Sequence, residues 1–264
     1  MGTPEELPGY AASRLLESCA AGWVGFAIMP INKIVATYAE AIANLQDGAV
    51  VMLDGFGGPG GMPTGLIAAL RDKGVKDLTI ISNTAGLPGF GVPPGIDYHN
   101  HAILFENRQV RKVVATFPVP RSGTTPFYEQ YRAGDVELEL VPQGTLAERI
   151  RAGGAGIPAF YTPTGVGTLM AGGKESRVFD GREYLLEHAL TADFALLRAH
   201  KADPMGNAVY RGTSRNFNSV MASAGRITVL EVDHLVELGD LDPEAVVTPG
   251  IYVQRVVQRP AGLI

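Results

Sequence analysis

The feature that most constrains the fold is an alternation of short apolar runs with longer segments of helical period. Runs rich in β-branched residues occupy positions 49–53, 78–82, 113–117 and 137–141, and helical segments occupy 63–74, 97–108 and 125–134. Parallel strands are buried on both faces and need a helical crossover between them. The order therefore predicts an α/β fold, with a largely parallel sheet that is covered by helices.

The second half of the chain continues this pattern with less regular spacing. Further strands are expected at 193–200, 207–211, 226–233 and 251–257, and helices at 145–153 and 218–225 with a short turn at 242–247. The residues "RVFDG" at 177–181, followed by Arg182, are typical of a hairpin turn. No internal repeat or low-complexity linker interrupts the sequence, which favours a single domain.

Charge and cysteine content exclude several classes of protein. The chain has 264 residues, a formal net charge of -5 and positive charges that are scattered, so we expect no nucleic-acid partner. The single cysteine, Cys19, excludes an internal disulfide framework and a multi-cysteine metal site. A reducing cytoplasm is the expected location.

The N-terminal segment contains an apolar run, "CAAGWVGFAIM", that resembles the core of a signal peptide. Glu5, Glu6 and Glu17 precede it with a single arginine, so the positive region of a signal peptide is missing. The run is also too short for a membrane span, and no membrane partner is expected. We interpret Met29 as the functional start, which makes 1–28 an N-terminal extension and 29–259 the folded domain.

A glycine-rich segment, "LDGFGGPGGMP" at 53–63, stands between a predicted strand and a predicted helix. Glycines at such a turn let a ligand approach the N–H groups of a helix N-terminus, which favours an anion or carboxyl site. Packing alone also explains such a turn, and both interpretations stay open. The G-x-G-x-x-G register of a dinucleotide site is imperfect, because Gly61 follows Gly60 and the next strand ends in Asn83 rather than in an acid.

Two amide side chains stand where predicted strands end. Asn83 follows the apolar part of the run 78–82, and Gln143 follows the run 137–141 just before a helix. The carboxyl ends of parallel strands share one edge of a sheet, where ligands bind in open α/β folds. Both amides are therefore expected to reach one crevice. The alternatives are that Asn83 caps a turn and that Gln143 is a solvated loop residue.

The segment 149–168, "RIRAGGAGIPAFYTPTGVGT", combines glycine, proline and aromatic residues with almost no charge after Arg151. Glycine and proline oppose a helix, and the segment is too apolar for a solvated linker. It predicts a packed, shaped loop, and contact with a partner chain is compatible with that interpretation.

Other candidate sites are weaker. His99 and His101 have a spacing that suits a metal, but no third ligand is evident, so no metal site is expected. The remaining histidines are isolated, and nothing resembles G-x-S-x-G. The chain shows no self-sufficient pair of nucleophile and base.

Several long motifs resemble the α (A) subunit of the family I coenzyme A transferases. They are "LTIISNTAG" (78–86), "ELELVPQGTLAERIRAGGAGIPAFYTPTGVGTL" (137–169), "GKESRVFDGREYLLE" (173–187), "RNFN" (215–218) and "ELGDLDPEAVVTPGIYVQRVV" (237–257). The resemblance covers roughly 29–259. Motifs of this length in one order are highly specific.

The resemblance implies a heteromeric enzyme that moves CoA from succinyl-CoA to a 3-oxo acid, either 3-oxoadipate or acetoacetate. The nucleophile, a glutamate that forms a glutamyl-CoA thioester, is implied on the partner β (B) subunit. By similarity, Asn83 and Gln143 line the crevice and donate to substrate or oxyanion. The residues assigned to CoA by similarity are Gly55, Phe56, Gly57, Gly58, Gly60 and Gly61. CoA is then a substrate, with no tightly bound cofactor.

The sequence departs from the family pattern at Asp54, at Thr84 and in a longer stretch at 87–108. These departures bear on the identity of the acid more than on the class of reaction. Three other functions stay open: a CoA-dependent thioester or ring-opening hydrolase on the same fold, a nicotinamide-binding oxidoreductase, and a purely structural or binding role.

Overall fold

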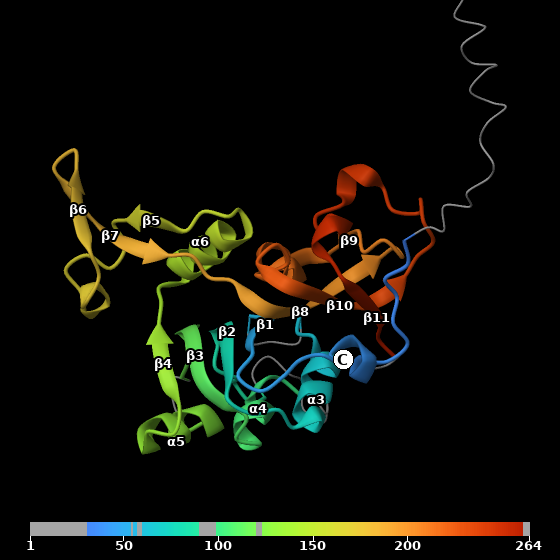
Figure 1. Ribbon diagram of the computed structural model, residues 1–264, viewed down its shortest axis with the longest axis horizontal. Coiled ribbons are helices and arrows are strands. Elements are labelled where there is room, and N and C mark those ends of the chain that lie inside the picture. Colours follow the sequence, from blue (N-terminus) through green and yellow to red (C-terminus); the bar gives the residue numbers. More distant parts are fainter. Residues whose placement is uncertain (1–30, 54, 57–59, 90–98, 120–122, 261–264) are drawn as a thin grey trace, which may run out of the picture. The chain divides into compact units, whose positions relative to one another are not determined.

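The computed structural model describes residues 31–53, 55–56, 60–89, 99–119 and 123–260 (Figure 1). From Asn32 onward the chain forms one compact unit. The expected N-terminal extension, 1–28, lies outside the described residues. Within the described part, no helix is long and apolar enough to cross a membrane.

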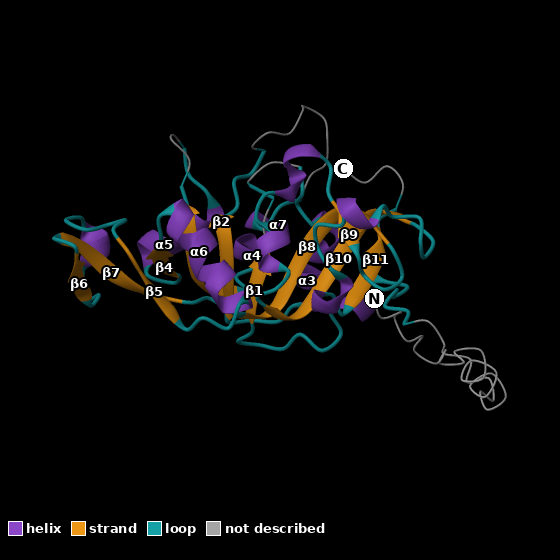
Figure 2. Cartoon of the chain, turned by 90° about the horizontal axis from the view of Figure 1, so that it is seen from above, coloured by secondary structure: helices purple, strands orange, loops and turns teal. Residues whose placement is uncertain are grey.

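The main sheet is parallel throughout except for one short strand. Its order is β11-β10-β8-β1-β2-β3-β4, and β9 pairs antiparallel with the end of β8. Figure 2 shows β8, β10 and β11 side by side. The strands are β1 (Val50–Leu53), β2 (Leu78–Thr84), β3 (Val110–Phe117), β4 (Glu137–Leu140), β8 (Ala192–Ala202), β9 (Ala208–Val209), β10 (Gly225–Leu235) and β11 (Arg255–Gln258). The predicted α/β fold with a largely parallel sheet is confirmed.

Helices pack on both faces of this sheet, as the apolar runs require. On one face lie α2 (Tyr38–Ala41), α3 (Thr64–Lys73), α4 (Ala102–Glu106) and α5 (Pro126–Ala133). On the other lie α6 (Gln143–Gly154) and α7 (Asn218–Met221). Strand β1 shows why two cores form: Val51 and Leu53 join the first cluster, and Met52 joins the second. Side chains alternate across a strand, so each face needs its own cover.

A second, antiparallel sheet follows the order β5-β7-β6, with β5 (Ala159–Thr162), β6 (Ser176–Phe179) and β7 (Arg182–His188). Asp180 (φ 48°) and Gly181 (φ 75°) connect β6 to β7. Positive φ at both central residues is the conformation of a two-residue hairpin turn, and the expected turn at 177–181 is confirmed. The strands themselves are a finding of the structure.

Helix α6 connects the two sheets through a buried arginine. Arg149 donates from Nε to the carbonyl oxygen of His188 in β7 at 2.6 Å, and from Nη1 to Oε1 of Glu139 in β4 at 2.7 Å. Arginine suits this position because its planar fork serves several acceptors at once. The second sheet is therefore held to the end of the main sheet by α6.

The expectation of a loop at 149–168 is wrong for much of its length. Helix α6 continues through Gly153 and Gly154, and 159–162 form strand β5. The two glycines serve close packing at the end of a helix: a Cβ on Gly153 would lie 2.0 Å from the Leu190 carbonyl oxygen, and one on Gly154 would lie 2.0 Å from Oγ of Ser223. Their presence therefore reflects tertiary contact and not a broken helix.

Two C-terminal expectations also need correction. The strand expected at 251–257 is shorter, because a 3₁₀ helix, η4 (Gly250–Tyr252), precedes β11. The strand expected at 207–211 is reduced to the two residues of β9. In both regions part of the apolar run forms a turn or a 3₁₀ helix instead of a strand.

Candidate active site

The topology of the main sheet locates a crevice at the carboxyl end of β1. From β1 the chain proceeds to β2 on one side, and the later strand β8 pairs with β1 on the other, Leu53 opposite Leu196. In open α/β sheets, ligands bind outside the carboxyl ends of the strands where the strand order reverses in this way. The glycine-rich turn follows β1 directly, so it borders this position.

The glycines of this turn are not equivalent. A Cβ on Gly55 would lie 2.6 Å from the backbone nitrogen of Met62, and one on Gly61, which has a φ of 89°, would lie 2.6 Å from the Ser214 carbonyl oxygen. These two are needed for packing. A Cβ on Gly60, which is exposed, would meet no atom within 4 Å. Gly57 and Gly58 lie outside the described residues.

Phe56 stands out within the turn because its backbone is strained. Its φ of 59° lies in the left-handed region, which a bulky side chain rarely adopts. The ring is 46% exposed and stacks on Phe217, with the ring centroids 5.9 Å apart. Strain of this kind is retained at ligand sites when surrounding contacts hold it.

Two asparagines fasten the turn to the region that follows β8. Asn218, fully buried, donates from Nδ2 to the Gly61 carbonyl oxygen at 2.9 Å and accepts on Oδ1 from the backbone nitrogen of Arg198 in β8 at 3.1 Å. Asn216 donates to the Gly60 carbonyl oxygen at 3.2 Å. No local pattern predicts a role for these two side chains, although their "RNFN" motif is among those that carry the resemblance.

Beside the turn lies a cavity of about 330 Å³. Aromatic rings, amides and small residues line it: Phe56, Gln143, Gly144, Ala147, Asn216, Phe217 and Val220. The described residues of this lining include no carboxylate, cysteine or histidine. Among the described residues, no group of three or more histidine, cysteine or acidic side chains is arranged to hold a metal ion.

The two amides expected to share a crevice meet at this cavity. Gln143, the exposed first residue of α6, donates from Nε2 to Oδ1 of Asn83 at 2.8 Å. Asn83 belongs to the end of β2 and is 4% exposed. Two residues 60 positions apart therefore form one hydrogen-bonded unit. Neither alternative interpretation, a turn cap for Asn83 or a solvated loop position for Gln143, describes this contact.

A buried histidine supports the strand end that carries Asn83. His101 Nε2 donates to the Thr84 carbonyl oxygen at 2.8 Å, and the Ser82 hydroxyl donates to the same oxygen. Burial lowers the pKa of His101 to about 4, although its hydrogen bond to Thr84 acts in the opposite direction. A neutral, buried imidazole that donates to backbone has a structural role here.

The N-terminus of α3 is occupied by the chain itself. Glu231 of β10 accepts on Oε2 from the backbone nitrogen of Leu66 at 3.0 Å. The sequence pattern favoured an anion or carboxyl site at this helix terminus, and the group found there is an internal carboxylate. An external anion would have to displace it.

The sequence of this chain matches a known family. A family model described as "Coenzyme A transferase" matches residues 35–259. The chain is 52% identical to the A subunit of 3-oxoadipate CoA-transferase from Pseudomonas putida, over 86% of this chain and 94% of that protein. It is 48% identical to the A subunit of a probable succinyl-CoA:3-ketoacid coenzyme A transferase from Bacillus subtilis (strain 168), over 86% of this chain and 90% of that protein.

A solved structure extends the likeness. The acyl-CoA transferase of Escherichia coli O157:H7, in a thioester complex with CoA, superimposes with a TM-score of 0.72 at 25% identity. The match covers 87% of this chain and 48% of that one, so the chain spans about half of the solved protein. With a family model that matches most of its length and relatives at this level of identity, the chain belongs to the coenzyme A transferase family.

Proposed function

We propose that the chain is the α subunit of a heteromeric coenzyme A transferase that moves CoA from succinyl-CoA to a 3-oxo acid. The names of the relatives in Pseudomonas putida and Bacillus subtilis support 3-oxoadipate or another 3-ketoacid as the acceptor. A partner β subunit supplies the nucleophilic glutamate. CoA enters as a substrate, and no tightly bound cofactor is required.

The observation that carries this proposal is the hydrogen bond between Gln143 and Asn83 beside a cavity whose described lining is uncharged. The contact uses Oδ1 of Asn83 as acceptor, and within the described residues Nδ2 of Asn83 makes no hydrogen bond to protein. Gln143 thus orients Asn83 with its amide donor available. The exposed amide of Gln143 adds a second donor at the same place.

Neutral amides suit the chemistry of a carboxylate nucleophile. The partner's glutamate attacks the thioester carbonyl carbon, and the developing oxyanion needs hydrogen-bond donors. The glutamate itself must remain ionised, so acidic donors beside it would be unfavourable. Asn83 and Gln143 donate hydrogen bonds without transferring a proton. Attack by the glutamate expels CoA as its thiolate and leaves an acyl-glutamyl anhydride. The thiolate then attacks the glutamyl carbonyl carbon, which forms the glutamyl-CoA thioester and releases succinate as the free carboxylate.

The exposed part of the glycine-rich turn is the proposed CoA contact. Phe56 and Gly60 face solvent, whereas Gly55 and Gly61 shape the turn from inside. Gly57 and Gly58 remain part of the proposal. The stacked rings of Phe56 and Phe217 provide an apolar wall for the pantetheine arm or the base.

The second sheet and the chain beside it form the proposed contact with the β subunit. Leu169 is 93% exposed, Val178 is 63% exposed, and Ile157 is also exposed. Exposed apolar side chains carried by one small sheet and its flanking loops are the basis for proposing an interaction surface there. The partner's glutamate must reach Asn83, and α6, which begins at Gln143, also anchors this sheet. The expected role of 149–168 at a contact between subunits is retained on this basis.

We also propose a cytoplasmic location, which the single cysteine supports. The domain boundaries 29 and 259 are retained as predictions, and the family match to 35–259 supports the second of them. No nucleic-acid or membrane partner is proposed.

The test is single-turnover formation of the glutamyl-CoA thioester by the complex of the two subunits. Gln143→Ala should slow its formation and discharge by about 10²–10³, the usual effect of losing one oxyanion donor. Gln46→Ala is the matched control, because Gln46 is an exposed glutamine near the amino end of β1. It should leave the rate unchanged, and both variants should assemble with the partner.

Other outcomes would redirect the assignment. A Gln143→Ala complex that forms and discharges the thioester at the wild-type rate would show that Gln143 does not stabilise the oxyanion. Consumption of succinyl-CoA without any acceptor acid would indicate the hydrolase. Turnover by this chain in the absence of its partner would contradict a nucleophile on the β subunit.

A further inference from the structure

A buried carboxylate on β10, which is separated from β1 by β8, lies against the helix that follows the glycine-rich turn. Glu231 of β10 is fully buried, and its Oε2 accepts from the backbone nitrogen of Leu66 in the first turn of α3. Its Oε1 lies 3.2 Å from Nη1 of Arg259, which follows β11 and is also buried. A buried carboxylate at a helix N-terminus is favourable in sign, because the terminus carries partial positive charge.

The remaining charged groups around Glu231 come from three elements. Arg198 of β8 and Arg259 both act on Glu231 electrostatically, and Tyr38 of α2 faces it. Asp233, two residues further along β10, lies 2.9 Å from Arg198 and 3.7 Å from Arg259. The His200 ring contacts Asp233 and not Glu231. Glu231 is thus the carboxylate of this cluster that reaches α3.

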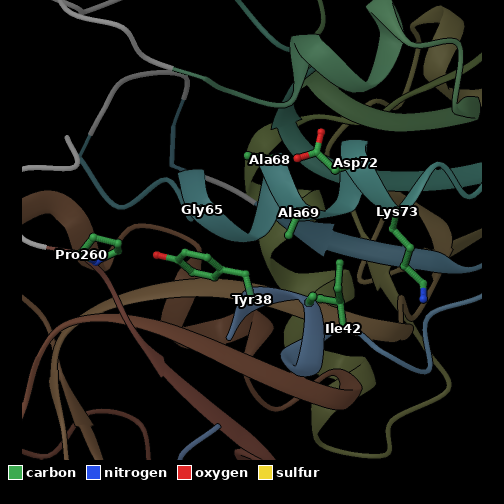
Figure 3. Close-up of a pocket in the computed structure, with 9 residues that line it drawn as sticks. Tyr38, Ile42, Gly65, Ala68, Ala69, Asp72, Lys73 and Pro260 are labelled. Carbon is green, nitrogen blue, oxygen red and sulfur yellow. The ribbon is translucent and has the colours of Figure 1, made fainter. Parts of the chain in front are cut away.

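An aromatic ring also packs against this helix terminus. Figure 3 shows Tyr38 lying between α2 and α3, with its hydroxyl directed toward Pro260. A Cβ on Gly65 would lie 2.2 Å from the Tyr38 ring, so the helix start cannot move toward α2 without a clash. Glu231 and Tyr38 therefore both pack against the first turn of α3.

We propose that Glu231 is a positioning residue for CoA binding: held by Arg259, its carboxylate fixes the start of α3 and thereby the residues that close the glycine-rich turn. This inference rests on the proposed function of that turn. Glu231 itself touches no substrate.

The path from Glu231 to the turn is short. Met62 and Pro63 immediately precede α3, and Met62 is fully buried. The backbone nitrogen of Met62 lies 2.6 Å from the place that a Cβ on Gly55 would occupy, so the two ends of the turn are in close contact. A shift at the start of α3 displaces both ends. The exposed residues Phe56 and Gly60 would then lose their position.

Protonation of Glu231 provides a specific signature. Burial raises the pKa of Glu231 to about 7, against the opposing effects of Arg259, Arg198 and the backbone N–H groups of Leu66 and Gly65. The protonated acid still accepts a hydrogen bond from Leu66 but no longer forms an ion pair with Arg259. Wild-type protein below neutral pH should therefore behave like a variant with an amide at this position.

The experiment compares Glu231→Gln with Asp233→Asn in the complex with the β subunit. The control removes a carboxylate from the same strand and the same cluster without a contact to α3. At pH 8, Glu231→Gln should raise the KM for succinyl-CoA about tenfold and leave kcat within about twofold, since a charge-assisted contact is lost. At pH 6 the two KM values should converge, because wild-type Glu231 is then protonated. Asp233→Asn should keep the wild-type KM at both pH values.

A second measurement does not depend on turnover. Hydrogen exchange at the amide of Leu66 should be faster in Glu231→Gln than in wild type at pH 8, and unchanged in Asp233→Asn. An unchanged KM with unchanged exchange would overturn the inference, as would a KM ratio that is equal at pH 6 and pH 8. An inactive wild-type complex would instead refute the proposed function, which separates the two failures.

Discussion

At the scale of single residues, His101 should make the free energy of unfolding depend on pH. Its pKa in the folded chain is about 4, below the ordinary value of 6.5. The unfolded chain therefore binds more protons between these values, and the stabilising effect is complete above pH 6.5 and lost as the pH falls toward 4. The imidazole is fully buried, so little of this effect is screened.

We expect the free energy of unfolding of wild type to fall by about 3 kcal/mol more than that of His101→Gln between pH 6.5 and pH 4. Chemical denaturation at a series of pH values measures this difference. Equal slopes for the two proteins would show that folding does not change the pKa of His101.

The residues of the site differ in how far sequence could identify them. Asn83 and Gln143 could be identified from the sequence because each follows an apolar run, and the carboxyl ends of parallel strands share one edge of the sheet. The hydrogen bond between them could not be predicted, because it depends on the order of strands in the sheet. Asn218 and Glu231 had no local signal: each acts on backbone more than 150 positions away, at Gly61 and Leu66.

At the scale of elements, the glycine-rich turn has glycines that are needed for packing and an exposed glycine that is not. A Cβ on Gly55 would overlap Met62, whereas one on Gly60 would contact nothing within 4 Å. Gly55→Ala should lower the free energy of unfolding by about 1–3 kcal/mol through overpacking, and Gly60→Ala should leave it nearly unchanged. Denaturant unfolding of both variants tests this prediction. Comparable losses of unfolding free energy in the two variants would mean that close packing at Gly55 does not constrain the turn.

The elements themselves show which patterns are sufficient. Runs such as 78–82 were assigned correctly because a β-branched run buried on both faces has few other solutions. Strands β5 and β7 were missed, since their residues are partly exposed and lack such a run. The helix expected at 145–153 is present as α6 and ends one residue later, where Gly153 and Gly154 pack closely against Leu190 and Ser223.

At the scale of the whole molecule, the second sheet carries a testable interface. The double substitution Leu169→Asp with Val178→Asp should weaken association with the β subunit at least about tenfold, since burying each apolar side chain contributes roughly 1.5–3 kcal/mol. Leu238→Asp is a control, because Leu238 is 52% exposed in the loop after β10. Calorimetric titration of each protein with the partner measures the three constants. A double variant that binds like wild type would exclude this surface.

The pairing of β1 with β8 has a consequence for synthesis of the chain. Val51 pairs with Phe194, so the central strand β1 cannot pair with β8 until more than 140 further residues have been synthesised. Until then β1 is an open edge beside β2, β3 and β4, with unsatisfied backbone groups that other strands could pair with. Closing such a long separation is slow, and the nascent chain therefore spends the interval as an aggregation-prone half-sheet that depends on protection at the ribosome.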